Sequence, residues 1–122
     1  MKLEAFLKVL TQTLHHSSHA YLEYMNAGKT FQFARQLKHH NSKALELLTE
    51  NKSLLTDDLK KDAEALIIHY TQWSQKWEKL AAEKDHQPDD VFVFANEVTF
   101  PRQAAKNIED ACQGFRDYHP IP

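Results

Sequence analysis

The chain has 122 residues, of which 42% are hydrophobic and 26% are charged, as in an ordinary globular domain. Its formal net charge is −2, whereas nucleic-acid-binding domains are usually strongly basic, so binding to nucleic acid is not expected. No apolar run approaches the ~20 residues of a membrane-spanning helix, and the charged residues 1–8 do not resemble a signal peptide. We therefore expect one cytoplasmic domain over residues 1–122, with no membrane or nucleic-acid partner and with 118–122 as an extended tail.

The charges are unevenly distributed along the chain. Residues 1–45 contain six lysine or arginine side chains against two glutamates, so this part is positive and the remainder is negative. We interpret the split as two parts that complement each other within one fold. The alternative is an acidic partner.

The first two predicted elements are helices joined by a short turn. Apolar residues recur at helical spacing over residues 2–25, and Asn26 to Gly28 then tolerate the left-handed backbone at a helix end. A second helix follows over residues 30–50. Because the turn is so short, the two helices should form an antiparallel hairpin.

A third and longer helix is predicted from an N-cap at Thr56 to about Glu83. Its apolar residues alternate in steps of four and three, which leaves one side of the helix apolar for more than three heptads. These residues are Leu59, Ala63, Leu66, Tyr70, Trp73, Trp77 and Leu80.

The fourth element combines two apolar stripes that do not align. Pro88 favours a helix start, and Val91, Phe94, Ala95 and Val98 share one helical face. Beyond Pro101 the stripe restarts on a different face, because proline removes a mid-helix hydrogen bond. The predicted fold is an all-α, antiparallel four-helix bundle with the last helix broken near Pro101. Val91–Phe94 as a strand remains an alternative.

Three residues of the first helix have spacing that suits a metal ion. His15, His19 and Glu23 follow at i, i+4 and i+8, and two imidazoles at i, i+4 can chelate one ion. On a helical wheel the two histidines point away from the apolar stripe, so solvated surface residues or a pH response are the competing interpretations. No cofactor is expected.

Polar residues on the inner faces suggest a buried layer. Ser17 and Asn41 lie near the centres of their apolar stripes and come level in an antiparallel hairpin, with His40 at the edge. Such a layer can set the register of the helices. The alternative is a small-ligand pocket formed by these three residues together with Tyr70, Trp73 and Trp77.

No motif in the chain carries enzymatic chemistry, since paired inward carboxylates, an activated nucleophile and a glycine-rich phosphate loop are all missing. We therefore expect a non-enzymatic regulator, adaptor or immunity-type protein, although an enzyme is left open. Its expected partner is another protein or a second copy. The candidate interface residues lie off the apolar stripes or in the basic stretch, and they are Phe31, Arg35, His39, Ile68 and Phe92.

Overall fold

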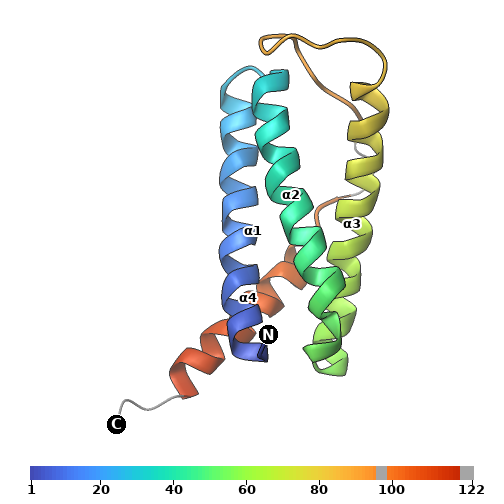
Figure 1. Ribbon diagram of the computed structural model, residues 1–122. Coiled ribbons are helices and arrows are strands. Elements are labelled where there is room, and N and C mark those ends of the chain that lie inside the picture. The colour runs from blue at the N-terminus through green and yellow to red at the C-terminus, as the bar shows by residue number, and fades with distance from the viewer. Residues whose placement is uncertain (96–98, 119–122) are drawn as a thin grey trace.

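The computed structural model describes residues 1–95 and 99–118, which form four α-helices and one 3₁₀ turn. The elements are α1 (Leu3–Asn26), α2 (Phe31–Asn51), η1 (Lys52–Leu54), α3 (Asp57–Ala81) and α4 (Arg102–Tyr118). They confirm the predicted all-α bundle. The three long helices α1, α2 and α3 run side by side, and α4 crosses them obliquely at one end (Figure 1). Within this part of the chain, no helix is long and apolar enough to cross a bilayer.

The α1–α2 hairpin closes as its turn residues predict. Gly28 and Lys29 both have positive φ, at 82° and 57°. The Lys29 N–H donates to the Tyr24 carbonyl over 2.9 Å, which is the long hydrogen bond of a Schellman motif. We call this end of the bundle, at the top of Figure 1, the upper end.

The prediction of a helix in the segment before α4 is wrong. Residues 91–95, expected to be helical, are extended, with one isolated antiparallel bridge between Val91 and Thr30. Burial alternates here as in a strand, because Phe92 is only 1% exposed whereas Val91 and Val93 are 69% and 50% exposed. Val98, the last residue of the predicted first half, lies outside the described residues. At the predicted break, residues 99–101 are not helical and α4 begins only at Arg102, so a helix broken into two halves is not found.

The same segment caps α2. Thr30 makes no side-chain capping hydrogen bond, and the first amides of α2 instead donate to the long connection. Phe31 N–H reaches the Asp90 carbonyl over 2.8 Å, and Gln32 N–H reaches the Pro88 carbonyl over 2.9 Å. The α3–α4 connection is therefore part of the bundle and closes its upper end.

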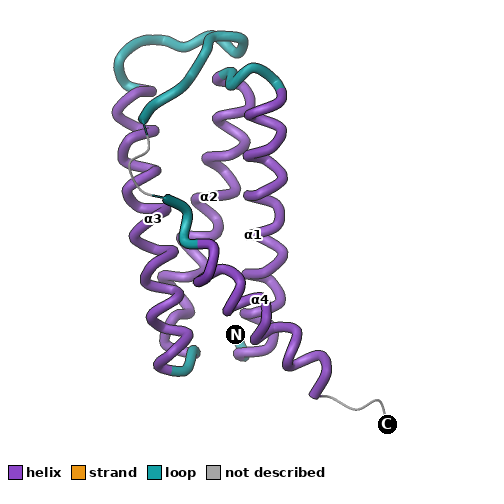
Figure 2. The backbone as a smooth tube through the Cα atoms, turned by 180° about the vertical axis from the view of Figure 1, so that it is seen from behind, coloured by secondary structure: helices purple, strands orange, loops and turns teal. Residues whose placement is uncertain are grey.

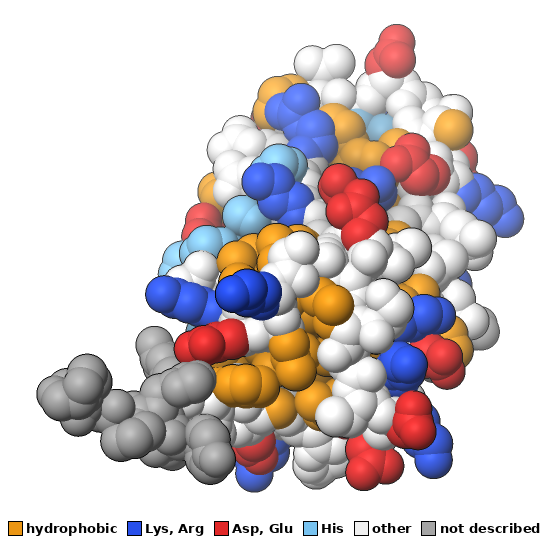
Figure 3. All heavy atoms as spheres, turned by 60° about the horizontal axis from the view of Figure 1, so that its bottom comes forward, with side chains coloured by type: hydrophobic (Ala, Val, Ile, Leu, Met, Phe, Trp, Pro, Cys, Tyr) orange, Lys and Arg blue, Asp and Glu red, His pale blue; other side chains and the backbone are white. Residues whose placement is uncertain are grey.

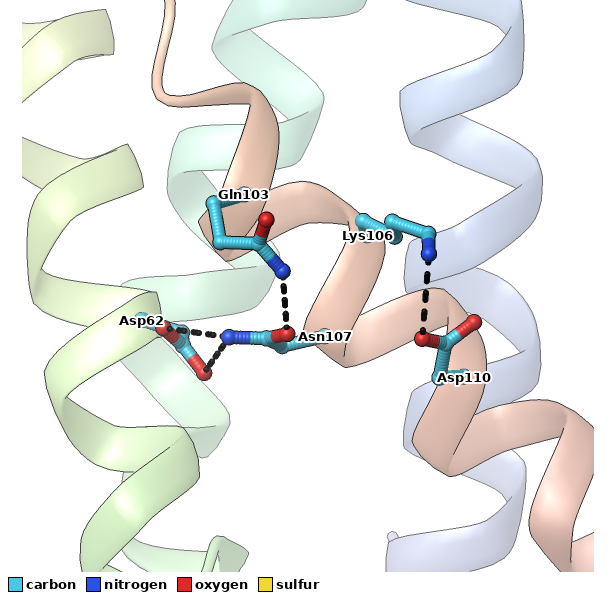
Figure 4. A network of polar contacts seen from close by, with 5 residues as sticks. All are labelled: Asp62, Gln103, Lys106, Asn107 and Asp110. Atoms are coloured by element: carbon cyan, nitrogen blue, oxygen red, sulfur yellow. Dashed lines mark hydrogen bonds and ion pairs between the residues drawn. The ribbon is translucent and has the colours of Figure 1, made fainter.

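Helix α4 covers only the lower half of the groove between α1 and α3 (Figure 2). Ala104 and Ile108 are buried in this contact. Beside them the Asn107 amide donates to both Asp62 carboxylate oxygens, over 3.2 and 3.3 Å (Figure 4). The helix continues to Tyr118, which was expected in the extended tail, and residues 119–122 of that tail lie outside the described part.

The core consists of two apolar clusters. The lower one joins all four helices around Phe6, Leu10, Leu48, Leu66 and Ile108. The upper one contains Ala20, Ala34, Leu37, Trp73, Trp77 and Phe92, so the α3–α4 connection supplies the residue that a fourth helix would otherwise supply.

Candidate functional site

A cavity of about 230 Å³ opens in the upper half of the bundle, and no described residue of α4 lines it. We call it the aromatic pocket. Its lining comes from α1, α2, α3, the α1–α2 turn and the extended segment, and consists of Tyr21, Tyr24, Met25, Lys29, Ala34, Leu37, Trp73, Trp77, Phe92, Val93 and Phe94.

Hydrogen bonds hold the aromatic walls in place. The Trp77 indole N–H donates to the Ala34 carbonyl of α2 over 3.2 Å. The Tyr24 hydroxyl donates to the Phe92 carbonyl and ties α1 to the extended segment. Burial, with a smaller effect of Tyr21, raises the pKa of Tyr24, so its hydroxyl remains protonated and keeps donating. The pocket is therefore largely preformed.

Phe92 anchors the extended segment beneath the pocket. Its ring centroid lies 5.1 Å from that of Trp77, 5.2 Å from that of Phe31 and 5.0 Å from that of His86. Trp73 packs in turn on Phe94, with centroids 5.8 Å apart. Such tilted contacts between rings are favourable beyond the area that they bury.

The mouth of the pocket is apolar. Tyr21, Met25 and Val93 line the pocket and are still 50%, 40% and 50% exposed. Large exposed apolar side chains that gather around one cavity mark a binding site more strongly than scattered ones do. The arrangement can hold an apolar group.

The predicted polar layer lies below this pocket. The Ser17 hydroxyl donates to the Asn41 side-chain oxygen, and both residues are buried. Burial raises the pKa of Tyr70 to about 12, against the opposing effect of its hydrogen bond with Ser17. The buried layer predicted for Ser17 and Asn41 is thus present, and Tyr70 belongs to it.

The residues predicted to form a small-ligand pocket lie at separate places in the structure. Trp73 and Trp77 line the aromatic pocket, whereas Ser17, Asn41 and Tyr70 do not. His40 lies on the outer side, where its ring is 5.8 Å from that of His16 and 5.4 Å from that of His39. Desolvation, followed by the charges of His39, His16 and Lys43, lowers the pKa of His40. Histidines line one flank of the molecule in Figure 3.

The predicted metal ligands do not converge. His15 pairs with Glu109 of α4 over 3.3 Å, while His19 pairs with Glu23 over 2.8 Å. In residues 1–95 and 99–118 no group of three histidine, cysteine or acidic side chains could hold a metal ion. Both histidines are well exposed, as the helical wheel indicates.

The five predicted interface residues do not form one surface. Phe92 is buried, because the segment expected to be helical is extended and turns this ring inward. Phe31 is half-buried against Trp77, and Arg35 lies over its ring at 5.1 Å. His39 is exposed on α2, and Ile68 is 55% exposed on α3.

No protein-family model, curated protein or solved structure matches the chain.

Sequence reasoning missed Tyr21, Tyr24, Met25, Val93 and Phe94 as pocket residues. The signal that could have found the last two is the short run of β-branched and aromatic residues at 91–94, a composition typical of an extended segment. Tyr21 and Met25 belong to the apolar stripe predicted for the first helix, and only the short reach of α4 leaves them uncovered.

Proposed function

We propose that this chain is a non-enzymatic binding protein, a regulator or adaptor, that takes one apolar side chain of a protein partner into the aromatic pocket. The observation that carries the proposal is a preformed, aromatic-walled cavity with an apolar mouth, placed where a regular bundle would have its fourth helix.

The size of the cavity favours a side chain over a cofactor. Sites for drug-sized small molecules commonly enclose ~300–1,000 Å³. The aromatic pocket, at about 230 Å³, is smaller. Interfaces between proteins are commonly dominated by a few anchor side chains that fill pockets of this kind, surrounded by contacts that exclude water. Tyr21, Met25 and Val93 would supply those surrounding contacts.

The two tryptophans of the chain, Trp73 and Trp77, both line the pocket, so intrinsic fluorescence reports its occupancy directly. We would select random twelve-residue peptides, displayed on phage, against the wild-type chain. Synthetic copies free of tryptophan would then be titrated while tryptophan emission is recorded. The expected result is a saturable change in emission for peptides that share one large apolar residue.

Two valines provide a matched pair of variants. Val93 lines the pocket mouth, whereas Val91 is more exposed and does not line it. Val93→Asp should weaken binding at least tenfold, because it places a charge where the apolar group enters, and Val91→Asp should bind like the wild type.

Ile68→Asp tests the alternative that the interface predicted from the sequence lies on α3, where Ile68 is exposed. Loss of binding in this variant, with Val93→Asp unaffected, would place the interface on the outer face of α3 and overturn the pocket proposal. So would the absence of any peptide that changes tryptophan emission.

A further inference from the structure

The charge at the aromatic pocket is of one sign. Among the described residues that line it, Lys29 is the one charged side chain, and none is acidic. Two acidic residues of the same end are paired elsewhere, Glu23 with His19 over 2.8 Å and Asp90 with Lys84 over 3.8 Å. The lining itself therefore carries positive charge beside its aromatic walls, and Glu83, Asp85 and Asp89 of the connection that contains Asp90 do not belong to it.

The backbone holds Lys29 in an unfavourable conformation. Its φ of 57° is in the left-handed region, which glycine and asparagine adopt more readily than lysine does. Two hydrogen bonds impose this conformation, from Lys29 N–H to the Tyr24 carbonyl and from Phe92 N–H to the Lys29 carbonyl, both over 2.9 Å. A lysine in a strained backbone conformation next to a cavity points to a use for its charge.

A second cation lies beside the pocket. The Lys76 ammonium of α3 donates to the Ala95 carbonyl over 3.0 Å, next to the lining residue Phe94. Lys29 comes from the α1–α2 turn, so the two cations approach the pocket from different elements. Neither has an ion pair among residues 1–95 and 99–118.

We propose that the partner of the aromatic pocket is an acidic protein segment, in which the apolar side chain that enters the pocket is flanked by aspartate or glutamate. This inference rests on the proposed function and adds the chemistry of the partner to it. Charge complementarity supports an acidic partner. The aromatic walls bind the apolar side chain, and the ammonium groups of Lys29 and Lys76 attract the aspartate or glutamate beside it.

The test uses one selected peptide in three versions, with acidic, neutral or basic residues flanking the same apolar anchor. Tryptophan emission gives each affinity at 20 mM and 500 mM NaCl. The acidic version should bind about 1.5- to 5-fold more tightly than the neutral one for each cation engaged, and the basic version more weakly. The difference should shrink at high salt because exposed charges are screened.

Lys29→Gly removes the charge and suits the positive φ, so the fold should be retained. This variant should lose the contribution of one cation, about 1.5- to 5-fold, from the preference for the acidic over the neutral peptide. Lys61→Gln changes an exposed lysine of α3 and should keep the full preference.

The outcomes separate the two proposals. If no version changes tryptophan emission, the pocket is not a binding site and both proposals fall. If all three versions bind equally, or the basic one binds best, only the acidic partner is overturned. Emission that changes with protein concentration alone would make a second copy the occupant and would also overturn the acidic partner.

Discussion

At the scale of single residues, Ser17 and Asn41 show how a polar pair can be tolerated in a core. Each interrupts an apolar stripe, and each satisfies the other across the α1–α2 hairpin. The pair lies between the two apolar clusters, so a shift of one helix by a turn would leave both groups buried without a partner. The layer therefore favours one register of the hairpin.

Ser17→Ala should lower the free energy of unfolding by about 1–3 kcal/mol, because the Asn41 amide stays buried after its partner is removed. Asn41→Leu alone should also destabilise the chain. The double variant should lose less than the sum of the two single losses, since it removes both polar groups together. Urea unfolding followed by far-UV circular dichroism measures all three, and strictly additive losses would contradict the coupling.

His69 is the residue from which we expect a pH dependence of stability. It is buried on α3 against Tyr70 and Phe100, and its Nδ1 has no hydrogen-bond partner among the described residues. Burial lowers the pKa of His69 below the ordinary value of 6.5, so the unfolded chain takes up this proton more readily than the folded chain does. The stabilising effect is fully present above pH 6.5 and is lost as the pH falls from that value through the lower pKa of the folded chain.

The free energy of unfolding should thus decrease from pH 7.5 to pH 5.5. His69→Gln, which cannot titrate, should show a smaller decrease over the same range, although its stability at pH 7.5 is altered. The control is Lys61→Gln, an exposed position on the same helix, which should retain the wild-type pH profile. An unchanged slope in His69→Gln would show that other groups carry the pH dependence.

At the scale of elements, the α3–α4 connection is held by a few strong contacts. Phe92 fills the upper cluster, and main-chain hydrogen bonds join residues 88–92 to the turn and to the first amides of α2. The carbonyls of Pro88 and Asp90 thus serve as the N-terminal cap that Thr30 does not supply. The position of the extended segment, and with it one wall of the aromatic pocket, depends on this anchoring.

Phe92→Ala should lower the free energy of unfolding by about 3–5 kcal/mol, the usual cost of deleting a buried aromatic side chain. The substitution should also release the α3–α4 connection from the start of α2. In hydrogen exchange followed by NMR, the Phe31 and Gln32 amides should lose more protection than the amides of the lower cluster.

The contrasting variant is Val91→Ala, which changes an exposed side chain of the same segment and should leave both amides protected. Uniform loss of protection in Phe92→Ala would mean that the connection does not open separately from the bundle.

At the scale of the whole molecule, the uneven charge along the chain is partly reconciled by the fold. His15 pairs with Glu109, and Lys38 pairs with Glu78 over 3.0 Å, so the positive first part contacts the negative later part. Most of the described ion pairs are largely exposed, and such pairs contribute about 0–1 kcal/mol each. The complementarity that we expected is therefore present but is not what holds the bundle together.

The arrangement of helices explains why the molecule has a pocket at all. A fourth helix that ran the full length of the groove would cover Tyr21, Met25, Trp73 and Trp77. Helix α4 instead begins at Arg102, and the preceding residues 91–95 follow an extended path (Figure 2). An extended segment brings fewer side chains over a given length than a helix does, so the upper half of the groove is less completely filled.

The lower end of the bundle shows an area of hydrophobic side chains bordered by charged ones (Figure 3). Four half-buried residues pack on the lower cluster from α1 and α4, namely Leu3, Ala111, Cys112 and Phe115.

The amino-acid sequence alone determined the all-α class, the bounds of the first three helices to within about two residues, the antiparallel hairpin and the Ser17–Asn41 layer. These features follow from local periodicity, from the turn residues around Gly28 and from the need to pair buried polar groups. The helix wheel failed at Phe92 because it assumed a helical period for a segment whose path is set by α2 and by the upper cluster. Only the tertiary structure decided that path, the short reach of α4 and the aromatic pocket, because each depends on contacts between residues distant in the chain.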